Sequence, residues 1–176
     1  FIPFRMTDKL AELEELQQRL AGSTVELFDT KWGLLAAGNE EKYNMMTISW
    51  GTVGELWSRD VCTVFVRPQR YTFGFMEEND TFSVSFFSPE YRKALSFCGT
   101  KSGRDYDKAE KTGLTLTMLD KTPAFSQAQT VLVCRKLYTQ DIEEKNFIDR
   151  GIIRECYPEK DYHRVYVGEI IGGYVK

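Results

Sequence analysis

Three short segments of the sequence place hydroxyl, cationic and aromatic side chains at spacings that suit a flat, anionic ligand. The first, residues 43–51, contains Thr47 and Ser49 two positions apart. On a β-strand these two hydroxyls would share one face, with Met46 and Ile48 on the other. Hydroxyls beside methionine and tryptophan suit a flat ring with polar edges. The alternative is a strand that leads into a hairpin, with the glycine at the end of the segment in the turn.

The other two segments carry positive charge. Residues 66–72 contain Arg67 and Arg70, where an apolar run ends and a helical pattern begins. Because a helix N-terminus offers free N–H groups and a partial positive charge, this junction suits a phosphate or a carboxylate. Residues 99–108 add two glycines, three cations and several hydroxyls, a composition that suits an anion-binding loop. The alternative for both segments is a solvated, charged surface.

Several common catalytic arrangements are absent from the sequence. It contains neither a Gly-x-Gly-x-x-Gly pattern nor a phosphate-binding Gly-Lys-Ser/Thr loop. His163 is the only histidine, and no serine stands in a nucleophile-elbow motif, so a hydrolytic triad is disfavoured. A single histidine also provides too few nitrogen ligands for a zinc site. We therefore expect no bound metal.

The cysteines form no Cys-x-x-Cys pair; they are Cys62, Cys98, Cys134 and Cys156. A cytosolic chain of this size usually keeps its thiols reduced. Cys62 and Cys134 stand in apolar, strand-like runs, so we expect them to be small core residues. A redox dithiol is the alternative interpretation.

Composition narrows the class of protein further. The chain has 176 residues, 42% of them hydrophobic and 14% aromatic, which favours one β-rich globular domain over disorder. The formal net charge of −3 disfavours a nucleic-acid partner. No uncharged stretch is long and apolar enough to span a bilayer. The first five residues contain no apolar signal core, so we expect a cytoplasmic protein without a membrane partner.

The elements that must position these segments are mostly strands. Leucines at helical spacing predict a helix over Asp8–Leu20, and we expect residues 1–24 to form a helical extension before a domain at 25–176. Strands are predicted over Val25–Phe28, Trp32–Ala37, Met45–Trp50, Val61–Val66, Thr81–Phe87, Leu114–Leu119, Thr130–Leu137 and Val165–Ile170. Short helices are predicted over Tyr71–Glu78, Pro89–Phe97, Asp107–Lys111 and Phe147–Arg150. Helices and strands do not alternate strictly, which argues against a doubly wound parallel sheet and for an all-β-dominated, antiparallel barrel with inserted helices.

Five motifs in order resemble the flavin reductase-like family, most closely its flavoredoxin-type branch. The motifs are Asn44-x-Met46-Thr47-x-Ser49-Trp50-Gly51, Val66-Arg67-Pro68-x-Arg70-Tyr71-Thr72, Phe82-x-Val84-Ser85-Phe86, Ser102-Gly103-Arg104-Asp105-x-Asp107-Lys108, and His163 with Gly168-Glu169. The resemblance extends from about Trp32 to Tyr174. Two positions depart from the family pattern: Ser85 replaces a frequent asparagine, and Asp161-Tyr162-His163 replaces a frequent Gly-Asp-His.

The resemblance implies an antiparallel, Greek-key split β-barrel that binds FMN at a homodimer interface. It implies that the strand with Met46, Thr47, Ile48, Ser49 and Trp50 contacts the isoalloxazine ring. It implies that the phosphate and ribityl end is held by Arg67, Arg70, Tyr71, Thr72, Ser102, Gly103 and Lys108. Further contacts are implied for Ser85 and Phe86.

The function implied by the resemblance is electron transfer between NAD(P)H and flavin. The implied catalytic residue is His163, which would orient the nicotinamide or the flavin edge; the alternative is a strand histidine packed at the dimer contact. Three other functions stay open. They are an FMN-carrying electron carrier that serves a protein acceptor, a non-catalytic split barrel for another ring ligand such as haem, and a β-rich structural domain.

Overall fold

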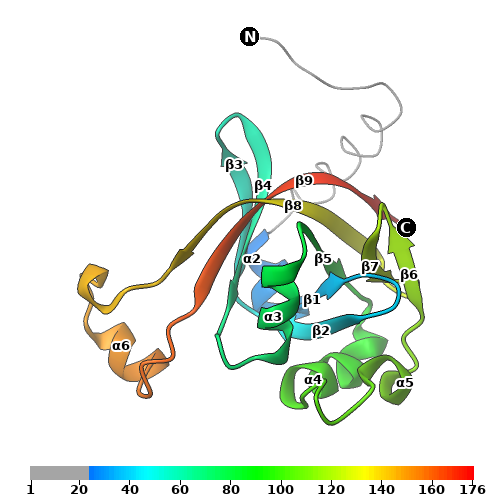
Figure 1. The fold of residues 1–176 in the computed structure, drawn as a ribbon, viewed down its shortest axis with the longest axis horizontal. Coiled ribbons are helices and arrows are strands. Elements are labelled where there is room, and N and C mark those ends of the chain that lie inside the picture. Colours follow the sequence, from blue (N-terminus) through cyan, green and yellow to red (C-terminus); the bar gives the residue numbers. More distant parts are fainter. Residues whose placement is uncertain (1–23) are drawn as a thin grey trace.

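The computed structural model describes residues 24–176, and the helix expected over Asp8–Leu20 lies outside the described residues. Strands dominate the described part (Figure 1). They are β1 (Gly33–Gly38), β2 (Tyr43–Ile48), β3 (Gly51–Leu56), β4 (Arg59–Val66), β5 (Thr81–Phe86), β6 (Leu116–Leu119), β7 (Thr122–Phe125), β8 (Thr130–Asp141) and β9 (Arg164–Val175). The helical elements are α2 (Thr24–Glu26), η1 (Leu27–Lys31), α3 (Tyr71–Glu78), η2 (Pro89–Tyr91), α4 (Arg92–Thr100), α5 (Lys108–Thr112), η3 (Glu144–Asn146) and α6 (Gly151–Cys156).

The described chain forms one seven-stranded antiparallel sheet in the order β2-β1-β5-β8-β9-β4-β3, with β6 and β7 in a separate pair. The two edge strands β2 and β3 are joined by Ser49 and Trp50 only. Seven flat strands would place the outermost pair roughly 29 Å apart. The chain from Ile48 to Gly51 spans at most about 11 Å. The sheet must therefore curl until its two edges meet at this connection.

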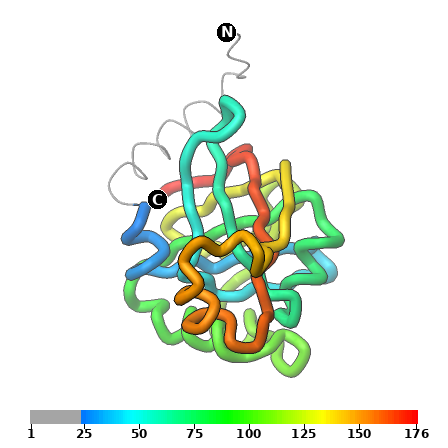
Figure 2. The backbone as a smooth tube through the Cα atoms, turned by 90° about the vertical axis from the view of Figure 1, so that its left-hand side faces the viewer, coloured from blue at the N-terminus to red at the C-terminus, as the bar shows by residue number. Residues whose placement is uncertain are grey.

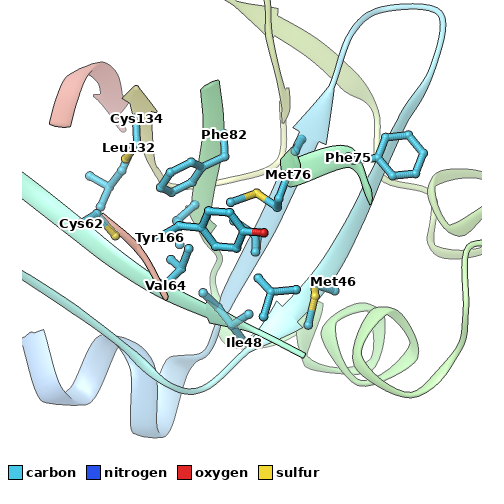
Figure 3. Close-up of a cluster of buried hydrophobic side chains, with 14 of the residues drawn as sticks. Met46, Ile48, Cys62, Val64, Phe75, Met76, Phe82, Leu132, Cys134 and Tyr166 are labelled. Atoms are coloured by element: carbon cyan, nitrogen blue, oxygen red, sulfur yellow. The ribbon is translucent and has the colours of Figure 1, made fainter. Parts of the chain in front are cut away.

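The curled sheet has an apolar interior and an apolar outer face. Phe82, Val84 and Phe86 alternate into the interior cluster, as the sequence pattern predicts, and Figure 3 shows Phe82 there with Met76 and Tyr166. A second cluster, on the other face, packs the sheet against α4 and β7. The four cysteines are all free thiols, and Cys62 and Cys134 lie fully buried in the interior, as predicted. Because both of its faces are packed, the sheet holds the strand β2 in a defined position.

The structure differs from the sequence predictions in five places. The run Val25–Phe28 is helical instead of a strand, because one turn suffices to place the Phe28 ring edge-on against Phe86, with ring centroids 5.5 Å apart. Residues 147–150 are irregular, and the helix begins only at Gly151. Strands β3 and β7 were missed. The hairpin alternative for Gly51 is also wrong: this glycine opens β3, and a Cβ there would lie 2.4 Å from the Phe28 ring.

Gly168, in the middle of β9, is expected to be intolerant of any side chain. A Cβ there would lie 2.7 Å from the Phe82 ring and 2.9 Å from Cβ of Cys134. Since overpacking a close-packed core costs roughly 1–3 kcal/mol, Gly168→Ala should lower the free energy of unfolding by that amount in a urea titration. Gly54→Ala on β3, where a Cβ meets no atom within 4 Å, is the matched control. Equal stabilities of the two variants would contradict this packing.

Candidate functional site

Three clefts follow one another along the open edge of β2, the strand seen between α3 and α4 in Figure 1. The inner cleft, about 220 Å³, is lined by Met46, Thr47, Ile48, Ser49, Trp50, Phe65, Arg67, Arg70 and His163. The middle cleft, about 140 Å³, is lined by Asn44, Gln69, Arg70, Tyr71, Thr72, Thr100, Lys101, Ser102, Gly103, Arg104 and Lys108. The outer cleft, about 420 Å³, lies between the β1–β2 turn, α3 and residues 103–109. Arg70 lines both the inner and the middle cleft.

The inner cleft is built on the edge of β2. Met46 and Ile48 point into the core, while the Thr47 hydroxyl donates to the carbonyl of Leu95 on α4 at 2.5 Å. The carbonyl of Met45 accepts a hydrogen bond from the Lys108 ammonium at the edge of β2 that pairs with no other strand. Since backbone groups of alternate residues face the same side of a strand, the N–H and C=O of Thr47 lie on this open edge too. The cleft thus offers a backbone donor and acceptor beside apolar side chains.

His163 forms the far wall of the inner cleft. Its Nδ1 lies 2.7 Å from the Tyr157 hydroxyl, and its ring lies 5.2 Å from the Trp50 ring, which is 46% exposed. Burial, together with the nearby Arg67 guanidinium, lowers the pKa of His163 to about 4, against the opposing effect of Asp161. Burial also raises the pKa of Tyr157. Both groups are therefore neutral at pH 7.

This buried histidine predicts a loss of stability in mild acid. The unfolded chain takes up a proton at the ordinary pKa of about 6.5, whereas the folded chain does not until about pH 4. As the pH falls from 6.5 to 5, the free energy of unfolding should therefore fall by about 1.5 kcal/mol. Urea titrations at the two pH values measure this. His163→Gln should remove the difference; a slope that persists in this variant would assign the effect to another group.

Arg67 has different partners from those that the resemblance implied. Its guanidinium forms an ion pair with Asp161 at 2.6 Å, donates to the carbonyl of Cys156 at 2.8 Å and stacks on Tyr157 at 5.0 Å. These contacts all reach residues 142–163, here called the arm, which joins β8 to β9. The arm projects from the barrel in Figure 1 and faces the viewer in Figure 2. Arg67 therefore anchors the arm, and with it His163, against the inner cleft.

The middle cleft is shaped by a close approach of two segments. The buried Asn44 amide donates to the Thr72 hydroxyl at 2.9 Å. A Cβ at Gly103 would lie 2.2 Å from Oδ1 of Asn44 and 2.9 Å from the Tyr71 ring, so only glycine fits there. Arg70 stands at the start of α3, which no side chain of the described chain caps, and donates to the carbonyl of Gly99 at 3.1 Å. Helix N–H groups, hydroxyls and a guanidinium thus meet in one place.

Lys108 is buried, although a lysine in a charged segment is expected to lie on the surface. Its ammonium donates to the carbonyls of Met45 and Cys98, both at 2.8 Å. Burial lowers its pKa to about 8, and the positive charge of Arg70 acts in the same direction. Two hydrogen bonds to carbonyls tie α4 and α5 to β2. Lys108 therefore supports the floor of the middle cleft, where the resemblance implied a direct phosphate contact.

The structure does not bring every predicted residue to the clefts. Ser85 and Phe86 lie in the sheet core, outside the lining of all three clefts, and the Ser85 hydroxyl has no hydrogen-bond partner among the described residues. Conversely, the site residues predicted from the sequence do not include Asn44, Arg104 and Tyr157. Asn44 and Arg104 stand within the motifs quoted above, whereas Tyr157 contacts His163 at the inner cleft through the fold of the arm, which no local pattern encodes.

The residues that line the inner and middle clefts suit the binding of a flat, anionic molecule.

The described part of the chain, residues 24–176, contains no group of three or more histidine, cysteine, aspartate or glutamate side chains that could hold a metal ion. Nor does that part of the chain contain a helix of the length and apolarity that crossing a membrane requires.

The model of the family described as "Flavin reductase like domain" matches residues 25–176, nearly all of the described chain. The protein belongs to this family. The curled antiparallel sheet is accordingly the split barrel expected from the sequence, although its edges meet without closing the hydrogen-bonded ladder. The resemblance seen in the motifs is thereby confirmed at the level of the family.

Solved structures of this fold include proteins with different named roles. A flavoredoxin from Methanosarcina acetivorans is 24% identical, with a TM-score of 0.64 over 83% of this chain and 68% of its own. An FMN-binding protein from Thermus thermophilus is 18% identical, with a TM-score of 0.66 over 100% and 82%. An NADH:FAD oxidoreductase from Streptomyces globisporus, in complex with NAD and FAD fragments, is 16% identical, with a TM-score of 0.63 over 98% and 87%. At these identities the likeness establishes the fold.

Proposed function

We propose that the inner and middle clefts together hold one FMN molecule, and that the protein is an NAD(P)H-dependent FMN oxidoreductase. The observation that carries this proposal is the position of Arg70, whose guanidinium lines both clefts beside the uncapped start of α3. A ring compartment joined to an anion compartment matches the two ends of FMN. Membership of the family and the FMN-binding neighbour support the same assignment.

The residues present fit this cofactor. In the middle cleft, Arg70, Ser102 and the first N–H groups of α3 would hold the phosphate, since a guanidinium pairs well with phosphate oxygens. The missing side chain at Gly103 lets this segment pack closely against Asn44 and Tyr71 at the wall of the cleft. In the inner cleft, the open backbone edge at Thr47 would meet the polar rim of the ring, with the exposed Trp50 indole beside it. FMN, when bound, supplies the chemistry of accepting two electrons from a nicotinamide and passing them on.

The side chains of the inner cleft would position the bound ring and set the polarity around it. His163 is neutral and shares a hydrogen bond between Nδ1 and the Tyr157 hydroxyl; in the tautomer in which Nδ1 accepts, the proton is on Nε2, from which it would donate into the inner cleft. The half-exposed Trp50 indole shields one side of the cleft from water. No side-chain nucleophile is needed, because the protein orients the reactants and the cofactor would accept and pass on the electrons.

The same proposal includes a homodimer. The β3–β4 hairpin projects from the barrel in both views (Figures 1 and 2), and its turn holds Trp57 54% exposed. Trp57 has φ of 55°, a left-handed conformation that tryptophan rarely adopts. Its ring lies 6.0 Å from that of the exposed Tyr138. An aromatic pair presented this way suits an interface with a second copy or with a protein electron acceptor.

The test is anaerobic mixing of the FMN-loaded protein with NADH and, separately, with NADPH. Bleaching of the flavin by either nucleotide, followed by steady nucleotide oxidation when free FMN is added, is the expected result. Bleaching by dithionite but by neither nucleotide would contradict the proposed oxidoreductase and favour a carrier that exchanges electrons with a protein partner. Failure to bind FMN would overturn the proposal altogether.

A further inference from the structure

The outer cleft, the largest of the three, is not needed for FMN. It begins where the middle cleft ends: Asn44, Tyr71, Gly103, Arg104 and Lys108 line both. The three clefts therefore lie in a row along the edge of β2, from the Ser49–Trp50 connection to the β1–β2 turn, and the residues shared by the middle and outer clefts form the low wall between them. An anion compartment in the middle separates two ring-sized compartments.

The walls of the outer cleft combine aromatic rings with cations. On α3, the Tyr71 and Phe75 rings pack edge to face at 5.1 Å. The Arg104 guanidinium lies 4.9 Å from the Tyr71 ring centre, and the Lys42 ammonium 5.5 Å from that of Phe75. Such surfaces bind nucleobases by stacking on rings and guanidinium planes.

Tyr106 lines the opposite side of the cleft. It is 39% exposed, and its ring is held edge-on to Phe97, with centroids 5.5 Å apart. A ring that is fixed at one edge and open on a face is suited to receive a flat ligand at small entropic cost.

The charges of the outer cleft favour a nucleoside that carries few phosphate groups. The lining carries Glu41, Asp105 and Asp107 as well as the cations, so a second polyphosphate would meet repulsion. Burial, with a contribution from Asp107, raises the pKa of Tyr43, whose neutral phenol can donate a hydrogen bond to a base nitrogen. The exposed Arg104 borders both the middle and the outer cleft, where a phosphate next to a nucleoside would lie.

We infer that the outer cleft binds the adenosine 5′-phosphate half of a dinucleotide whose other half either is the flavin in the inner and middle clefts, as in FAD, or lies over the bound FMN, as in the nicotinamide nucleotide. This inference rests on the proposed flavin site. The dinucleotide has two sources with this same group, FAD in place of FMN and the nicotinamide nucleotide that reduces FMN, and the experiment separates them.

The test compares Tyr106→Ala with Tyr91→Ala. Tyr91 is a matched control, because it is also a partly exposed tyrosine packed against one aromatic ring, that of Phe87, but lies outside all three clefts and takes no part in the proposed interface. Dissociation constants are measured by calorimetry for FMN, FAD and 5′-AMP, and for NADH and NADPH on the FMN-loaded protein.

The inference predicts that Tyr106→Ala weakens 5′-AMP and one dinucleotide by about tenfold, as loss of one stacked base does, and leaves FMN unchanged. Weakened FAD assigns the group to a flavin dinucleotide, and weakened NADH or NADPH assigns it to the electron donor. Unchanged affinities for all dinucleotides, or equal losses in the Tyr91→Ala protein, would overturn the inference while FMN still binds. Loss of FMN binding in the unmodified protein would instead refute the flavin site itself.

Discussion

Replacing Arg70 with alanine should weaken FMN binding by about 10- to 100-fold. A hydrogen bond to a charged group contributes roughly 1.5–3 kcal/mol, and each 1.4 kcal/mol is a factor of ten in affinity. Within residues 24–176 the Arg70 guanidinium donates one hydrogen bond, to the carbonyl of Gly99, so its other N–H groups are available to a ligand. Fluorescence titration of the flavin-free variant with FMN measures the loss.

The matched control for this prediction is Arg59→Ala on β4. Arg59 pairs with Glu169 at 2.9 Å on the exposed surface, away from the clefts, and such pairs contribute little to stability. Its FMN affinity should equal that of the unmodified protein. An Arg70→Ala variant that folds and binds FMN as tightly as this control would show that the phosphate lies elsewhere.

Gly103→Ala should reduce FMN affinity at least about tenfold and also lower stability. The new Cβ would lie 2.2 Å from Oδ1 of Asn44, so that buried side chain must move. Its movement breaks the hydrogen bond to Thr72 and shifts the wall of the middle cleft. Leaving a buried polar group without its partner costs roughly 1–3 kcal/mol. Thermal unfolding and the FMN titration together measure the two effects.

Gly74→Ala is the control for Gly103. Gly74 lies on the exposed side of α3, where a Cβ meets no atom within 4 Å, and alanine is the better helix former. This variant should be as stable as the unmodified protein or more stable, with unchanged FMN affinity. If both glycine variants bind FMN equally well, the tight approach of Gly103 to Asn44 has no part in the site.

Sequence patterns predicted the fold well where local periodicity and burial agree. Alternation placed Phe82, Val84 and Phe86 on one face of β5, and the helical pattern of α3 matched Tyr71–Glu78 at both ends. The same patterns failed where packing decides: Gly51 looks like a turn residue, but it is small because the Phe28 ring lies against it.

The candidate site was predictable in part for the same reason. Thr47 lies in a segment that forms a strand edge, and Arg70 lies in a second segment that starts a helix. Both are local features, and the structure brings the two residues to one cleft. The roles of Arg67 and Lys108 depend on distant partners, Asp161 in the arm and the carbonyl of Met45 on β2. A sequence shows that these side chains are cationic, but not that the fold already occupies them.

The central claim is that the inner and middle clefts form a flavin site, and an equilibrium titration of the flavin-free protein with FMN tests it most directly. The account predicts saturable binding of one FMN per chain, with a change in the visible flavin spectrum as the ring leaves water, and weaker binding by Arg70→Ala but not by Arg59→Ala. Absence of binding, or equal binding by both variants, would contradict it.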